Sequence, residues 1–204
     1  MGFFDKLFGS GGKPGFEMQP TAVMMDEDRY WRLIADSLAA SGGEQDPQAA
    51  YLTDALQKLE PADIVGFRLR TDRLLYDTYT SDMWAAGYIM NGGCSDDAFE
   101  YFRLWIISRG RAVYENAKTN PDSLVEVHGG TVEDFYDFES LWYVANTAFE
   151  KKTGKNLYDY IDTDNFKTKE GNYPEFEFTW QEENPDSLAK ICPRLCRRFE
   201  NEDC

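Results

Sequence analysis

The sequence contains a single histidine, His128, among 204 residues. Nucleophilic sites of the Cys–His kind and most zinc sites need a histidine close to its partner residues. Cys94 lies 34 positions before His128, and that separation gives no signal for such a pair. The sequence also lacks a glycine-rich phosphate loop and a nucleophile elbow. It therefore identifies no reaction and no ligand.

Long apolar runs are absent as well. No segment approaches the roughly 18 apolar residues of a membrane span. The N-terminus lacks the charged and apolar regions of a signal peptide. We therefore expect a cytoplasmic protein without a transmembrane segment, in which the four cysteines are reduced rather than bridged.

Basic residues are scarce relative to acidic ones. The chain has 21 Lys and Arg residues against 37 Asp and Glu residues, a formal net charge of −16. Because phosphate backbones are bound mainly by Lys and Arg, this balance argues against nucleic acid as a partner. The excess is concentrated in residues 121–189, which hold 16 acidic and 5 basic residues. An acidic surface of this kind favours a basic partner protein.

Aromatic residues are abundant, with 14 Phe, 12 Tyr and 5 Trp. With a hydrophobic fraction of 42%, they provide the apolar surface for a folded core, which disordered acidic chains lack. A length of 204 residues fits one domain. From residue 26 onward the apolar residues recur at helical spacing. We therefore predict an all-α protein, an irregular bundle of about six to eight helices.

Capping residues and glycines place the ends of the predicted helices. Asp26 and Ser95 each precede a helix whose first turn is acidic. Asp46-Pro47 is expected to open a helix with a cap and a proline at the first position. The clearest apolar stripe predicts a helix over 138–149, ended by Gly154.

The chain is expected to have two parts. Residues 1–15 form an apolar peptide and a glycine-rich linker. Residues 16–204 form a single helical domain, with a core at 26–154 and a C-terminal extension at 155–204. In the extension, residues 175–180 alternate polar with aromatic side chains, which predicts an extended acidic segment laid over the helices.

The N-terminal peptide carries four large apolar side chains that would share one face of a helix: Phe3, Phe4, Leu7 and Phe8. Such a face suits a membrane surface, a partner groove or a patch on its own domain. About two turns of helix are too short to be stable alone. We therefore expect a flexible peptide, with peripheral membrane contact as an alternative.

The densest group of unusual residues lies where two predicted helices meet through a glycine turn. Its candidate ligand-binding residues are Asn91, Gly92, Gly93, Cys94, Ser95, Asp96, Asp97, Tyr101 and Arg103. Free amide groups at the start of the second helix suit an anion, but Asp96 and Asp97 already place negative charge there. The same aspartates oppose a thiolate at Cys94. A structural corner with a half-buried cysteine is the main interpretation, and a ligand or catalytic site is the alternative.

Arg103 is the residue that motivates this alternative. It would face the first turn of its helix and pair with Asp96 or Glu100 around a pocket. Because Glu100 and Arg103 are three residues apart, a plain surface ion pair is the competing explanation. The catalytic residues of such a site stay unidentified.

No metal site and no cofactor are expected. Cys192, Cys196 and Cys204 supply three thiols, but their spacing differs from a zinc knuckle and no histidine is near them. Cys192 and Cys196 would share one face of a terminal helix, which predicts packing. Asp162 and Asp164 hint at a calcium loop, but the glycine that would make its turn is absent.

Two blocks of sequence carry a family resemblance. The first is Asp26-Glu27-Asp28-Arg29-Tyr30-Trp31, and the second runs from Asp82 to Asp97 and continues through 99–106 to Arg109-Gly110. These blocks resemble a bacterial family known as a domain of unknown function, the family numbered 4240. The resemblance covers about residues 26–154, with a weaker echo at 193–195. It implies a helical fold and no established reaction.

Two classes of function follow from these observations. The favoured one is a non-catalytic protein-interaction module that presents an acidic surface to a basic partner, because no catalytic constellation is visible. The alternative is an enzyme or small-ligand binder that uses the corner from Asn91 to Asp97.

Overall fold

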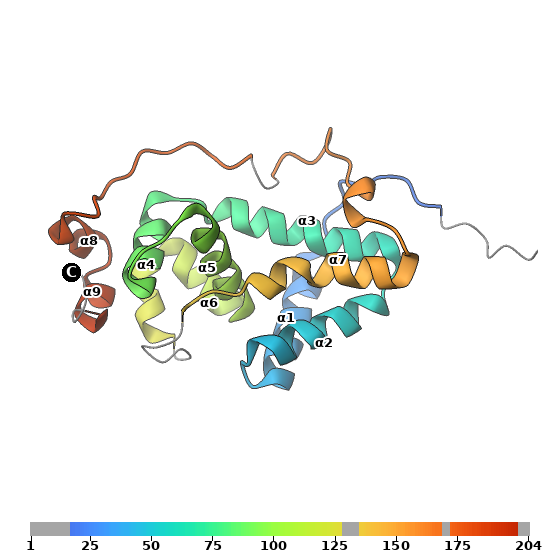
Figure 1. The fold of residues 1–204 in the computed structure, drawn as a ribbon, viewed down its shortest axis with the longest axis horizontal. Helices are drawn as coiled ribbons and strands as arrows, with labels where there is room; N and C mark the ends of the chain where they lie inside the picture. The colour runs from blue at the N-terminus through green and yellow to red at the C-terminus, as the bar shows by residue number, and fades with distance from the viewer. Residues whose placement is uncertain (1–16, 128–134, 169–171, 200–204) are drawn as a thin grey trace, which may run out of the picture.

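The structure is a computed structural model that describes residues 17–127, 135–168 and 172–199. These residues form nine α-helices and two short 3-10 helices but no strand, so the prediction of an all-α fold is confirmed (Figure 1). The elements in chain order are α1 (Glu27–Ser41), α2 (Gln45–Gln57), α3 (Pro61–Asp77), α4 (Ser81–Asn91), α5 (Asp96–Ser108), α6 (Arg111–Thr119), η1 (Pro121–Glu126), α7 (Glu139–Thr153), η2 (Leu157–Tyr160), α8 (Pro185–Ile191) and α9 (Pro193–Phe199). The predicted N-terminal peptide and His128 lie outside the described residues.

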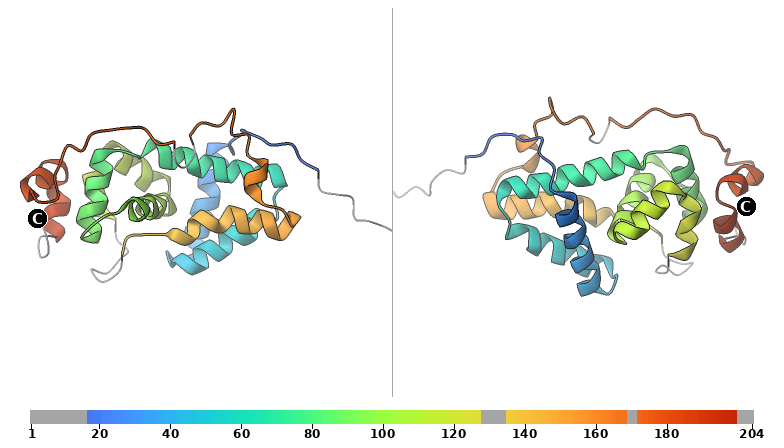
Figure 2. Two further views of the ribbon diagram at one scale, coloured as in Figure 1. Left: turned by 45° about the horizontal axis from the view of Figure 1, so that its top comes forward. Right: turned by 180° about the vertical axis from the view of Figure 1, so that it is seen from behind.

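The helices form an elongated molecule with α8 and α9 at one end (Figure 1). Toward the other end, α2 packs against α1 and α7, and α7 also packs against α3. The middle of the molecule is held by α5, which contacts α3, α4, α6 and α7. At the end that holds α8 and α9, α9 packs against η1 and α4. The view from behind also shows the C-terminal helices at one end of the molecule (Figure 2). Helix α5 therefore connects the helices in the middle of the molecule.

Local capping explains where several helices begin and end. The side chain of Asp26 accepts a hydrogen bond from the backbone N–H of Arg29 at 2.9 Å, which confirms the predicted start of α1. Gly154 ends α7 in the left-handed conformation, with φ of 70°. The predicted cap at Asp46-Pro47 is wrong by two residues, because α2 begins at Gln45. Proline is tolerated there because the first N–H groups of a helix have no partner within the helix.

Helix α4 is buried on most of its surface, as its apolar composition predicts. Its buried residues are Ser81, Met83, Trp84, Ala85, Ala86, Gly87, Ile89 and Met90. Contacts with α5, α8, α9 and η1 account for this burial. The two ends of α4 are therefore fixed in place, and the glycine turn that follows it starts from a rigid element.

The segment from Tyr173 to Trp180, which we call the aromatic strap, has no helix or strand. It runs along the outer edge of the molecule toward α8 (Figure 1). Its rings pack on the helices: Tyr173 stacks on Tyr79 at 4.3 Å between centroids, and Trp180 packs on Tyr88 at 5.2 Å. The strap thus continues the aromatic core along the surface of α4.

The C-terminal end of the described chain is a pair of short helices. Cys192 lies between α8 and α9, so the prediction that it shares one terminal helix with Cys196 is wrong. Both cysteines are nevertheless buried, in agreement with packing. From η1, the buried carboxylate of Asp122 accepts hydrogen bonds from the backbone N–H groups of Arg194 and Leu195, both at 2.9 Å. This contact ties α9 to η1.

The segment before α1 crosses α3 at a glycine. The backbone N–H of Met25 donates to the carbonyl of Gly66 at 2.9 Å. A Cβ atom placed on Gly66 would lie 2.9 Å from the backbone nitrogen of Met25 and 3.1 Å from the carbonyl oxygen of Val23. Because backbone atoms cannot move aside as a flexible side chain does, only glycine fits this crossing.

We predict that Gly66→Ala lowers the free energy of unfolding by about 1–3 kcal/mol, because it forces the two backbones apart. Helix propensity alone predicts the opposite sign, a gain of about 1 kcal/mol. Urea denaturation followed by circular dichroism measures the change. A stabilised variant would contradict the close approach.

Candidate functional site

Asn91, the last residue of α4, holds the chain that leads into α7. Its Oδ1 accepts a hydrogen bond from the backbone N–H of Tyr136 at 2.8 Å, and its Nδ2 donates to the carbonyl of Tyr136 at 3.4 Å. Two bonds from one amide to one residue fix both the position and the direction of this segment. The polar side chain that marked the corner in the sequence is therefore engaged in a contact between distant parts of the chain.

Glycines make the turn of the corner. Gly92 and Gly93 have φ values of 64° and 139°, in the range that favours glycine. The N–H of Gly93 donates to the carbonyl of Tyr88 at 3.0 Å. The carbonyl of Cys94 accepts from the indole Nε1 of Trp84 at 2.9 Å. These contacts engage the N–H of Gly93 and the carbonyl of Cys94 within the turn.

The thiol of Cys94 packs against α4. A Cβ atom on Gly87 would lie 3.2 Å from its Sγ and 3.0 Å from Phe102, so the absence of a side chain at Gly87 makes room for it. Burial raises the pKa of Cys94 to about 12, and the nearby Asp96 acts in the same direction, although Arg103 opposes it. A thiol with this pKa is protonated at neutral pH. Cys94 is therefore not activated as a nucleophile.

The remaining corner residues begin α5. The Oγ of Ser95 accepts from the backbone N–H of Ala98 at 3.3 Å, which confirms the predicted cap. Asp96 and Asp97 are exposed in the first turn, with no cation within 4 Å among the described residues. Their charge stabilises the positive end of the helix dipole.

Tyr101 lies one turn further along α5, facing the start of α7. Its hydroxyl donates to Oε1 of Glu139 at 3.3 Å, and its carbonyl accepts from the backbone N–H of Phe138 at 3.0 Å. Desolvation and the negative charge of Glu139 raise the pKa of Tyr101 to about 12. The phenol is therefore protonated at neutral pH and links the two helices.

Arg103 is buried, with 1% of its surface exposed. Its Nη1 donates to the carbonyl of Leu75 at 2.6 Å, and its Nε donates to the carbonyl of Phe99 at 3.1 Å. Its guanidinium also lies 4.3–5.0 Å from the ring centroids of Phe99, Tyr173 and Tyr79. Burial lowers the pKa of Arg103, whereas Tyr173 and Glu100 oppose this change. The competing explanation of a surface ion pair fails in its surface position, because α5 turns this residue into the core.

Beside the corner, a shallow pocket of about 590 Å³ lies between the aromatic strap and α4. Its walls are aromatic and include Tyr79, Trp84 and Phe178. Among the candidate residues of the corner, Asp96 alone contributes to its described lining. The structure thus brings the corner residues together around helix contacts rather than around a cavity.

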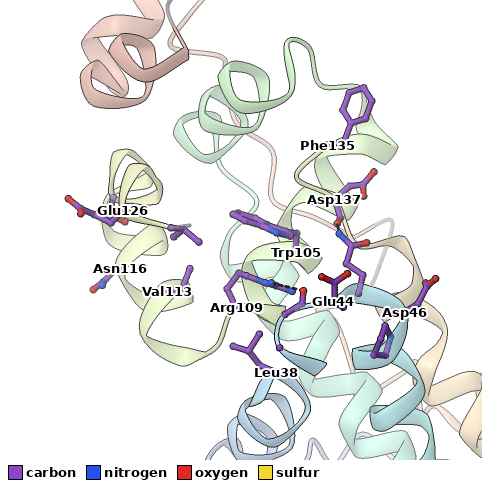
Figure 3. Close-up of a pocket in the computed structure, with 16 residues that line it drawn as sticks. Leu38, Glu44, Asp46, Trp105, Arg109, Val113, Asn116, Glu126, Phe135 and Asp137 are labelled. Carbon is purple, nitrogen blue, oxygen red and sulfur yellow. Dashed lines mark hydrogen bonds between the residues drawn. The ribbon is translucent and has the colours of Figure 1, made fainter. Parts of the chain in front are cut away.

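A larger pocket of about 1110 Å³ opens at the C-terminal end of α5, and we call it the α5-end pocket (Figure 3). Trp105 and Arg109 project into it from α5. Glu44, Asp46 and Asp137 lie on one side of these residues, while Val113, Asn116 and Glu126 lie on the other. The turn between α1 and α2, the segment before α7, α6 and η1 together form its rim.

Arg109 holds part of the rim of this pocket in place through hydrogen bonds. Its guanidinium donates to the carbonyl of Gly43 at 3.1 Å, to Oε1 of Gln48 at 3.0 Å and to Oγ of Ser108 at 3.0 Å. The acceptors are neutral, and no carboxylate among the described residues lies within 4 Å of it. Burial lowers the pKa of Arg109. Arg109 thus joins α5 to the α1–α2 turn without neutralising the pocket's acids.

The acids of the α5-end pocket differ in their surroundings. Glu126 is paired with Arg194. Burial, with a smaller effect of Glu139, raises the pKa of Asp137. Glu44, Asp46 and Asp137 have no cation within 4 Å among the described residues. Sequence reasoning missed this group, because residues more than 90 positions apart in the chain give no local signal of their meeting.

The described residues contain neither a cluster suited to a metal ion nor a helix suited to spanning a membrane. No group of three or more His, Cys, Asp and Glu side chains there is placed to hold a metal ion. In the same part of the chain, no helix combines the length and the apolar character needed to span a membrane.

Residues 25–151 match the family described as "Protein of unknown function (DUF4240)". The chain belongs to this family. The resemblance predicted from the two sequence blocks is thereby confirmed. The DUF4240 match includes both the corner and the rim of the α5-end pocket, whereas the aromatic strap, α8 and α9 lie beyond it. No curated protein and no solved structure matches the chain.

We predict that Cys94 of this DUF4240 protein reacts with iodoacetamide at pH 8 at least about a hundredfold more slowly in the folded chain than in urea. The reason is that burial keeps the thiol protonated. Mass spectrometry of the peptide containing Cys94 measures the rate separately from the other cysteines. Equal rates in the two states would show an accessible, ionised thiol.

We also predict that Arg103→Lys lowers the free energy of unfolding by about 3 kcal/mol. Lysine keeps the charge but cannot reach both carbonyl groups or stack on the rings. The matched control is Arg111→Lys, because Arg111 makes exposed ion pairs with Glu27 and Asp28 and its replacement should cost about 0–1 kcal/mol. Similar losses in both variants, measured in urea, would contradict the role of Arg103.

Proposed function

We propose that this DUF4240 protein is a non-catalytic protein-interaction module that binds a basic partner through the α5-end pocket. The contacts of the corner support the non-catalytic part. Asn91 is bonded to Tyr136, the thiol of Cys94 is protonated, and Arg103 is buried among backbone carbonyls and rings. Each of these chemically active groups has a structural use, which weakens the alternative of an enzyme or small-ligand site at the corner.

The α5-end pocket supports the proposal because it combines negatively charged side chains with an exposed aromatic ring. Glu44, Asp46 and Asp137 line the pocket with carboxylates, and Phe135 adds an aromatic ring to the same lining, whereas Trp105 is buried with 2% of its surface exposed. Phe135 is 71% exposed, so its ring is available to a partner. Carboxylates bind the charged end of an Arg or Lys side chain, while aromatic rings attract the same cation and cover its apolar stem.

Arg109 supports this assignment although it carries a positive charge. Its donors are directed toward Gly43, Gln48 and Ser108, which orders the rim of the pocket. Glu44 and Asp46, which have no cation within 4 Å among the described residues, therefore keep their charge available. The order of the rim also lowers the entropy cost of binding, because these groups are held before the partner arrives.

Long-range electrostatics favours the same partner. A net charge of −16 attracts basic proteins and repels acidic ones over about the Debye length, roughly 8–10 Å at physiological salt. Such a field speeds the encounter, whereas the pocket supplies the local contacts that select the partner. Binding should therefore weaken as salt is added.

The test uses a fluorescein-labelled peptide with three arginines separated by Gly-Ser, because it presents Arg side chains without a fixed structure. We predict that Glu44→Gln/Asp46→Asn binds the peptide about tenfold more weakly than the unaltered chain. Fluorescence anisotropy at low and high salt measures both affinities. The loss should be largest at low salt, where charges are least screened.

The matched control is Asp36→Asn/Asp54→Asn, which removes the same charge from exposed positions of α1 and α2 away from the pocket. It should change the affinity by less than about twofold. Equal losses in the two variants would assign binding to the net charge alone. An affinity that does not change with salt concentration would contradict the electrostatic basis of the proposal.

A further inference from the structure

The aromatic strap is fixed to the helices at both ends. At its start, Tyr173 stacks on Tyr79 with an angle of 3° between the rings, and its hydroxyl donates to Glu100 at 3.0 Å. At its end, the backbone N–H of Thr179 donates to Oγ of Ser81 at 2.9 Å. The indole Nε1 of Trp180 donates to the carbonyl of Ser81, also at 2.9 Å. The chain between these two anchors is therefore held in place.

Between the anchors, the backbone has no hydrogen-bond partner among the described residues. No such bond joins any N–H or carbonyl group of residues 174–178 to the rest of the described chain. This stretch runs along the outer edge of the molecule (Figures 1 and 2). An irregular stretch whose backbone groups lack such partners can pair with a strand from another chain.

The side chains of this stretch differ between its two faces. Phe176 packs on Trp84 and Tyr79, and Phe178 packs on Trp84 at 5.2 Å between ring centroids. Glu175 and Glu177 are exposed, with no cation within 4 Å among the described residues. Phe176 and Phe178 therefore attach the strap to Trp84, although Phe178 remains 52% exposed. Glu175 and Glu177 present two exposed carboxylates with the spacing of side chains on one face of a strand.

We infer that residues 175–178 pair edge to edge with an extended segment of a partner protein that carries Lys or Arg at every second position. The backbone groups of the partner would bond to the N–H and carbonyl groups of the strap that have no partner among the described residues. Its basic side chains would lie beside Glu175 and Glu177 on the solvent face, where opposite charges on neighbouring strands stabilise pairing.

The charges of the strap also argue against a second copy of this chain as the segment that pairs with it. Two straps paired edge to edge would place Glu175 and Glu177 of both copies on the same solvent face. Like charges on neighbouring strands destabilise the pair. The edge is thus protected against self-association by its acids, and the same acids select a basic partner.

This inference concerns a second surface, distinct from the α5-end pocket, and it goes beyond the proposed function. The two surfaces share a preference for basic partners but recognise them differently. The pocket needs only a cationic side chain, whereas the strap needs a free backbone as well. That difference separates the two experimentally.

The probe is a labelled nine-residue peptide of alternating Lys and Thr, compared with the same peptide carrying N-methyl groups on alternate residues along one edge. Binding of both peptides to the full chain is measured by fluorescence anisotropy. We expect the N-methylated peptide to bind about tenfold more weakly, because N-methylation removes the donors needed for strand pairing but keeps every charge. Equal affinities for the two peptides, or no binding of either, would overturn the inference.

Protein variants locate the binding site. Glu175→Gln/Glu177→Gln should weaken binding of the alternating peptide about tenfold. The matched control Glu182→Gln/Glu183→Gln removes the same charge from exposed positions just beyond the strap and should cost less than about twofold. Equal losses in the strap variant and this control would assign binding to diffuse charge and overturn the inference.

The pocket variant Glu44→Gln/Asp46→Asn separates this inference from the proposed function. It should leave binding of the alternating peptide within about twofold of the unaltered chain. If it abolished that binding while the strap variant did not, the strap would be excluded and the pocket would stand. A different result would exclude the proposed function and support the strap. In that result, only the strap variant loses binding of the alternating peptide, and the pocket variant binds the arginine peptide as tightly as the unaltered chain does.

Discussion

The burial of Arg103 is the constraint on which the middle of this molecule depends. Removing a guanidinium from water costs several kcal/mol unless hydrogen bonds and nearby charges or rings replace its hydration. Here the carbonyls of Leu75 and Phe99 accept two of its donors, and three aromatic rings surround it. Because those groups come from α3, the turn between α3 and α4, α5 and the aromatic strap, the cation can be buried only where these parts of the chain meet. The end of α3, the corner and the strap are therefore fixed relative to one another.

Similar structural contacts explain why the corner, whose residues suggested a site in the sequence, is not the surface best suited to binding. Asn91 and Arg103 bond to backbone groups of distant segments, and Cys94 fills the space left by Gly87. Polar side chains used in this way stabilise one arrangement of helices, since an unpaired buried donor would be costly. The groups left for a partner are carboxylates and rings at the edges of the same framework. They lie at the α5-end pocket and along the strap.

The parts of the structure that could be predicted from sequence are those set by neighbouring residues. The side chains of Asp26 and Ser95 cap their helices by accepting hydrogen bonds from the backbone N–H groups three residues further along the chain. The apolar stripe of α7 follows from the 3.6-residue period of a helix. The contact between Asn91 and Tyr136 spans 45 residues, and that between Arg109 and Gly43 spans 66. No local pattern encodes such meetings. The sequence therefore indicated the corner residues but not their partners, and it gave no sign of the α5-end pocket.

The most direct test of this account is a double-mutant cycle between Arg103 and Tyr173, measured as free energies of unfolding in urea. The single variants Arg103→Lys and Tyr173→Leu and the double variant report whether the buried cation and the strap stabilise each other. The account predicts a coupling energy of about 1 kcal/mol, because the ring of Tyr173 lies 4.8 Å from the guanidinium. Effects that add to within about 0.3 kcal/mol would contradict it, since the strap would then be held independently of Arg103.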